Sequence, residues 1–68
     1  MKANVIRGKI IEQYGTISNW TRDHQWPLTK INRILSGRQD IAASDIKTVA
    51  ASLKIEDPAE IVSLFLSS

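Results

Sequence analysis

The charged side chains of this 68-residue chain are unevenly distributed along it. Residues 1–38 carry seven Lys and Arg against two carboxylates, a net charge of +5. Residues 39–68 carry two Lys against five carboxylates, a net charge of −3. A basic half beside an acidic half suits a polyanionic partner on one face of the molecule. An ordinary solvated surface produces the same distribution, so both interpretations stay open on charge alone.

Few side chains in the sequence are suited to catalysis or to metal binding. The absence of cysteine removes disulfides and thiolate ligands, and the one histidine, His24, does not make a metal site by itself. Asp57 and Glu60 are explained by helix capping, and neither a nucleophile–base pair nor a glycine-rich phosphate loop is present. We therefore expect a protein that is not an enzyme, with no cofactor, no metal and no small-molecule substrate.

The apolar residues are dispersed and form no long run. No stretch approaches the ~20 apolar residues that cross a bilayer, and the N-terminus lacks the uninterrupted apolar segment of a signal peptide. Hydrophobic residues make up 43% and charged residues 24% of the chain, which is an ordinary globular balance. We expect one domain over residues 1–68, located in the cytoplasm and without a membrane partner.

Turn and capping residues divide the chain into five short predicted helices, which gives an all-α fold class. No segment shows sustained period-2 alternation, although residues 61–66 could form a strand on composition alone. The predicted helices run from about Asn4 to Tyr14, from Ile17 to about His24, from Pro27 to Ser36, from a Ser44 cap through Leu53, and from Pro58 through Leu66.

Several residues carry the start and stop signals of these helices. Gly15 and Gly37 are expected to close the first and third helices. Thr16 and Ser44 are expected to cap the second and fourth. The run Asp57-Pro58-Ala59-Glu60 is typical of a capping box variant, with Asp57 as the cap, Pro58 in the first turn and Glu60 three residues after the cap.

Helical spacing of the apolar residues predicts which faces are buried. The clearest amphipathic pattern is Ile46, Val49, Ala50 and Leu53 in the fourth helix. Ile31 and Ile34 form the inner face of the third helix, with Trp20 and Trp26 as large core anchors and His24 as a packed or half-exposed helix residue.

The segment Ile17–Leu35 contains two short helices joined by a tight turn. It resembles the helix-turn-helix of the Cro/C1-type (XRE-like) phage repressor family, and the resemblance covers about residues 16–55. It is strongest in Ile31-Asn32-Arg33-Ile34-Leu35-Ser36-Gly37-Arg38, where the family shows Ile, a polar pair, Ile, two further residues, Gly and a basic residue. The resemblance implies a compact five-helix, lambda-repressor-like DNA-binding domain with the helix-turn-helix at about residues 17–35.

Three positions depart from the family pattern. Thr21 stands where a small Ala is usual, and Pro27 stands where a capping Ser or Thr is common. Gln25 occupies the place of the turn glycine, and a non-glycine residue in a left-handed conformation costs about 1 kcal/mol or more. We therefore expect the turn, and with it the tilt of the following helix, to differ from the family.

The resemblance makes residues 27–36 the recognition helix, which would lie in the major groove of B-form DNA. Arg33 would then pair with guanine, and Asn32 would contact adenine edges or phosphate. Thr29 and Leu28 would meet a thymine methyl group. The expected base contacts are Leu28, Thr29, Asn32 and Arg33, and the expected phosphate contacts are Thr16, Ser18, Asn19, Lys30, Ser36, Arg38 and Gln39.

The apolar tail has five apolar residues among six positions, more than one helical stripe buries. We expect it to close the core and also to form a homodimer interface through Ile61, Leu64, Phe65 and Leu66. The expected function is a Cro-like phage or prophage repressor in a bacterial cell, which reads a pseudo-palindromic operator with half-sites about one helical turn apart. The alternative, suggested by apolar Leu28 and the tail, is an antirepressor or antitoxin-like module that masks a second phage regulator. A helical bundle without a polyanionic partner is the third possibility.

Overall fold

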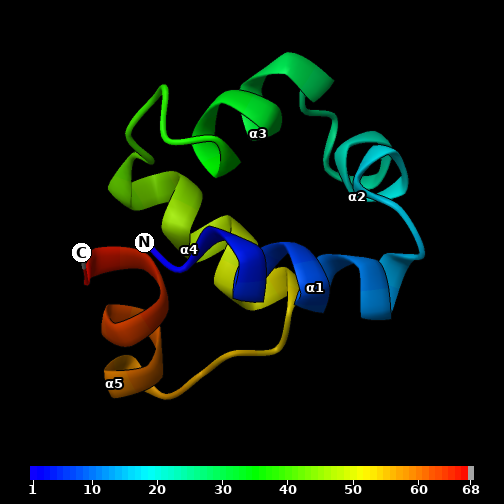
Figure 1. Ribbon diagram of the computed structural model, residues 1–68. Coiled ribbons are helices and arrows are strands. Elements are labelled where there is room, and N and C mark those ends of the chain that lie inside the picture. Colours follow the sequence, from blue (N-terminus) through cyan, green and yellow to red (C-terminus); the bar gives the residue numbers. More distant parts are fainter. Residues whose placement is uncertain (68) are drawn as a thin grey trace.

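The chain folds into short helices joined by connections of a few residues (Figure 1). The computed structural model describes residues 1–67. Its elements are α1 (Ala3–Tyr14), α2 (Ile17–His24), α3 (Leu28–Leu35), α4 (Ala43–Ser52), α5 (Pro58–Ile61) and a π-helical turn, η1 (Val62–Leu66), that continues α5. No β-strand occurs among residues 1–67, which confirms the all-α prediction and removes the strand alternative for residues 61–66.

Helix α1 is the centre of the arrangement, because it packs against α2, α3 and η1. In Figure 1, α3 lies on one side of α1 and α4, and α5 lies at the opposite end of the molecule beside both termini. Two backbone bonds join those termini: the amino group of Met1 donates to Ser67 O, and Lys2 N–H donates to Leu64 O at 2.8 Å. The first and last elements therefore close on each other.

The local start and stop signals are mostly confirmed. Gly15 follows α1 with φ 86°. The hydroxyl of Thr16 accepts a hydrogen bond from Asn19 N–H at 3.0 Å, and Asp57 Oδ1 accepts one from Ala59 N–H at 3.0 Å. Each cap satisfies a backbone donor that the helix leaves free in its first turn.

Other predicted boundaries are wrong by a residue or two. Pro27 has an extended ψ of 136° and precedes α3, so the helix begins at Leu28 and ends at Leu35 instead of spanning residues 27–36. Ala42, not Ser44, stands before α4, and Ser44 lies inside its first turn. Glu60 lies in the first turn of α5 as predicted, but its carboxylate lies 3.9 Å from Lys9 Nζ, so the capping box lacks its reciprocal bond.

Helices α2, α3 and α4 end with the same backbone hydrogen-bond pattern. In each, a residue with positive φ is followed by a residue whose N–H donates to the carbonyl five residues back, the arrangement of a Schellman motif. The positive-φ residues are Gln25 (58°), Gly37 (79°) and Lys54 (60°). The corresponding N–H to carbonyl bonds run from Trp26 to Thr21, from Arg38 to Arg33 and from Ile55 to Ala50, each at 2.9 Å. Gln25 thus adopts the left-handed conformation in spite of its side chain, and the turn forms at an energetic cost.

The core is apolar and is built around Trp20, which has no exposed surface. The four predicted core residues of α4 are buried, as are Ile31 and Ile34 of α3. Trp26 is only partly buried, which corrects the expectation that it is a core anchor. It lies in the turn that follows α2, and its ring packs edge-on against Trp20 with centroids 4.8 Å apart. His24 is half-buried and stacks on Trp20 with centroids 4.3 Å apart.

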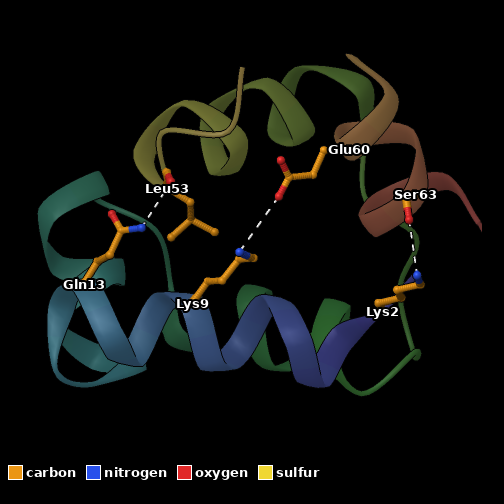
Figure 2. A network of polar contacts seen from close by, with 6 residues as sticks. All are labelled: Lys2, Lys9, Gln13, Leu53, Glu60 and Ser63. Carbon is orange, nitrogen blue, oxygen red and sulfur yellow. Dashed lines mark hydrogen bonds and ion pairs between the residues drawn. The ribbon is translucent and has the colours of Figure 1, made fainter. Parts of the chain in front are cut away.

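A polar stripe on α1 holds the C-terminal part of the chain (Figure 2). Lys2 Nζ donates to Ser63 Oγ at 3.2 Å, Lys9 Nζ lies 3.9 Å from Glu60, and Gln13 Nε2 donates to Leu53 O at 3.1 Å. At 100° per residue the three α1-side residues fall within about 40° of one another around the helix. This stripe marks the edge of α1 that faces the C-terminal part of the chain, and α1 also packs against α3.

Within residues 1–67, no helix has the length and apolar character needed to span a bilayer.

Candidate nucleic-acid interface

The buried face of α3 determines which side chains point outward. Ile31 and Ile34 are each 1% exposed and Leu35 is 5% exposed, so the helix is held from behind along one stripe. The opposite side presents exposed residues of hydrogen-bonding type: Thr29, Asn32, Arg33 and Ser36. A helix whose inner side is fully packed cannot rotate to hide these groups, and their orientation is therefore fixed by the core.

A shallow hollow gathers five of the eleven predicted contact residues. It is lined by Thr29, Asn32, Arg33, Ser36 and Arg38, together with Arg7 from α1. We call this set of six residues the basic hollow. Three of the four arginines of the chain line it, and none of its lining residues carries a negative charge. The structure thus brings together three residues predicted to contact bases and two predicted to contact phosphates on one surface.

The Schellman motif at the end of α3 positions Arg38 beside Arg33. Gly37, with φ 79°, reverses the chain, and Arg38 N–H donates to Arg33 O at 2.9 Å. The same carbonyl accepts from Gln39 N–H at 3.3 Å and from Ser36 Oγ at 3.2 Å. Three donors therefore satisfy the carbonyl of Arg33, and the loop after α3 is held against the helix end.

Lys30 is placed away from the basic hollow. Its Nζ lies 3.1 Å from the Asp45 carboxylate and 4.1 Å from the centre of the Trp26 ring. Lys30 is two positions from Asn32, which puts the two side chains about 160° apart around the helix. The charge of Lys30 is therefore paired with α4 and lies apart from the basic hollow, and its phosphate contact stays a prediction.

The remaining predicted phosphate contacts lie outside the basic hollow. Thr16, Ser18 and Asn19 are exposed at the start of α2, where Thr16 caps the helix and Asn19 Nδ2 donates to Tyr14 O at 3.0 Å. Gln39 lines a different, largely apolar hollow between the loop after α3 and η1. Leu28 is 43% exposed but is not among the residues that line the basic hollow.

The tail residues divide between the core and the surface. Leu64 is 6% exposed and Phe65 is 4% exposed, so these two close the core and offer little area to a partner. Ile61 is half-buried, whereas Val62 is 52% exposed and Leu66 is 63% exposed. The apolar surface that this end of the chain leaves for a partner therefore consists mainly of Val62 and Leu66, beside the hollow that Gln39 and Leu66 share.

Arg7 is the residue of this surface that sequence reasoning missed. It follows Ile6, which is 1% exposed, and it lies about 160° from Lys9 around α1. Lys9 faces α5, so Arg7 must border the apolar stripe on the opposite edge, toward α3. The sequence spacing shows that Arg7 and Lys9 lie on opposite edges of α1. It does not show which other helix packs against each edge, and so it does not place Arg7 next to α3.

Residues 1–67 contain no group of three or more His, Cys, Asp or Glu arranged to hold a metal ion. The basic hollow offers guanidinium, hydroxyl and amide groups, which bind anions and the polar edges of bases.

Searches against models of known protein families, against curated proteins and against solved structures find no match for this chain.

Proposed function

We propose that the protein is a sequence-specific regulator of transcription that binds double-stranded DNA through a helix-turn-helix formed by α2 and α3. The observation that carries the proposal is the outer face of α3. It presents Asn32 and Arg33 to solvent from a helix whose inner residues are buried, next to two further arginines. The resemblance to the Cro/C1-type family supports the same assignment and favours a phage or prophage repressor acting in the bacterial cytoplasm.

In this proposal α3 enters the major groove, which is wide enough for one helix. Arg33 donates two hydrogen bonds to a guanine edge, Asn32 exchanges a donor and an acceptor with adenine, and Thr29 contacts a thymine methyl group. Arg38 and Ser36 bind the sugar–phosphate backbone and set the register of the helix. The start of α2, with Thr16 and Ser18, contacts the backbone on the other side of the groove.

A single module of this size buries modest surface on DNA, so we propose that two copies bind a pseudo-palindromic operator together. The exposed side chains of Val62 and Leu66 are the proposed contact between the copies. A dimer doubles the number of contacts with DNA. It also explains why apolar side chains at this end of the molecule stay exposed in a single copy. Analytical ultracentrifugation of the wild type and of Leu66→Ser, with and without operator, tests this part.

The decisive experiment selects bound sequences from a random duplex pool and then measures affinity by fluorescence anisotropy. We expect a symmetric consensus, and we expect Arg33→Ala to lose about 1–3 kcal/mol and to relax selectivity at one position of each half-site. Arg22→Ala is the matched control, because Arg22 is an exposed arginine on α2 that does not line the basic hollow. Equal effects of both variants, or no selected consensus, would contradict the proposal.

One observation favours the alternative, a module that binds a second regulator protein. Leu28 is 43% exposed at the start of α3, where a DNA-reading helix more often carries a polar group. Leu28→Ser distinguishes the two functions. A protein-binding module loses partner affinity with this change, whereas a DNA-binding protein keeps its salt-dependent affinity and shifts its preference only at the base pair that Leu28 meets.

A further inference from the structure

We infer that the part of the basic hollow lined by Arg7 and Arg38 is the seat of one backbone phosphate of bound DNA, with Arg7 as the cation that α1 contributes to it. This inference rests on the proposed function and deepens it. It extends the DNA-binding surface beyond the helix-turn-helix, to a helix that the sequence resemblance does not assign to DNA contact.

The described residues of the chain leave the charges of the hollow unpaired. Within residues 1–67, ion pairs closer than 4.0 Å join Lys9 to Glu60 and Lys30 to Asp45. Arg7, Arg33 and Arg38 have no such partner in that part of the chain. Three guanidinium groups around one hollow repel one another, and a bound anion removes that repulsion.

The position of Arg7 cannot be explained by helix electrostatics. Arg33 and Arg38 lie at the carboxyl end of α3, where the helix dipole favours a positive charge. That preference gives both residues an ordinary structural reason to be basic. Arg7 belongs to the first half of α1, so the dipole of its own helix gives no such reason. Its placement on the hollow is therefore the observation that points to a ligand.

The chemistry of the lining fits a phosphodiester. The guanidinium group is planar and presents paired donors that match two phosphate oxygens, and it stays charged at any physiological pH. Thr29, Asn32 and Arg33 line the side of the hollow formed by α3 and remain available for the base edges. The carboxyl end of a helix repels anions, but the donors already bonded to Arg33 O offset this, and Arg7 and Arg38 supply the attraction.

The test measures the salt dependence of DNA binding by Arg7→Gln. Each phosphate contact contributes about 0.9 to the slope of log affinity against log salt. We expect the variant to lose about that much slope per copy, to bind on the order of tenfold more weakly at low salt, and to keep the wild-type consensus. Arg22→Gln is the matched control and should keep the wild-type slope. Arg7→Lys should restore the slope, because it restores the charge.

Thermal unfolding of Arg7→Gln separates this role from a structural one. Removing one of three crowded like charges should leave the melting temperature unchanged or raise it, and a clear decrease would overturn the inference. Wild-type slope in Arg7→Gln would also overturn it while leaving the proposed function intact. A wild-type protein that binds no duplex at low salt would instead refute the proposed function itself.

Discussion

The link between Trp20 and Ser52 is the most informative test of how this fold is held together. The Trp20 side chain is completely buried, and its Nε1–H donates to Ser52 Oγ at 2.8 Å. The same hydroxyl donates to Val49 O at 2.6 Å, so it serves α2 and α4 at once. The change Ser52→Ala removes the acceptor and leaves an indole N–H inside the protein without a partner.

The size of the effect follows from two opposing contributions. A buried donor left without its acceptor costs about 1–3 kcal/mol. Alanine is the better helix former by roughly 0.5 kcal/mol, which offsets part of the loss at the end of α4. We expect a net decrease in the free energy of unfolding of about 1–2 kcal/mol, and each kcal/mol lowers the melting temperature of a domain this small by about 4–8 °C.

Urea unfolding followed by far-UV circular dichroism measures the difference. Ser44→Ala is the matched control, because it is the same substitution in the first turn of the same helix, at a position where the side chain is exposed. Trp20→Phe combined with Ser52→Ala completes a double-mutant cycle that isolates the bond. If Ser52→Ala unfolds at the same urea concentration as Ser44→Ala, the bond contributes nothing and the reasoning is wrong.

Three glycine-related changes test the backbone of the same fold, each by the shift of its urea midpoint from the wild type. Gly8→Ala should stabilise by about 0.5–1 kcal/mol, because Gly8 lies inside α1 and a Cβ there meets no atom within 4 Å. Gln25→Gly should stabilise by about 0.5–1 kcal/mol, because glycine relieves the positive φ of 58°. Gly37→Ala should destabilise by about 1 kcal/mol through its φ of 79° alone, since the surrounding space is open. Opposite signs would contradict each of these predictions.

The sequence predicts the features of this fold that depend on neighbouring residues. Thr16 and Asp57 cap helices because the donors that they satisfy lie two or three residues away. The buried face of α4 follows from a regular spacing of apolar residues. Ser44 shows the limit of such signals: α4 begins at Ala43 although Ala42 has no capping side chain, because tertiary packing overrides a weak local preference.

The features that the sequence does not predict depend on contacts between distant elements. Lys30 and Arg33 are equally basic and lie on the same short helix, yet Lys30 pairs with Asp45 fifteen positions away while Arg33 faces solvent. Arg7 borders α3 because the burial of Ile6 and Ile10 fixes which face of α1 is turned inward. Five apolar residues in the tail predict burial, but which of them close the core is decided by the turn of η1.

The polar groups of this chain divide into those that stabilise the fold and those that the fold leaves free. The bonds of Gln13, Tyr14 and Trp20 all end on residues 52 and 53 at the end of α4. The arginines of the basic hollow lie on α1, on α3 and in the loop after α3. A cluster of like charges without ion-pair partners among residues 1–67 departs from the rule that local choices favour the native state, and such departures are expected at functional sites. The two sets should therefore respond independently. Ser52→Ala should lower the free energy of unfolding without changing the salt dependence of DNA binding. Arg7→Gln should lower that salt dependence without lowering the free energy of unfolding.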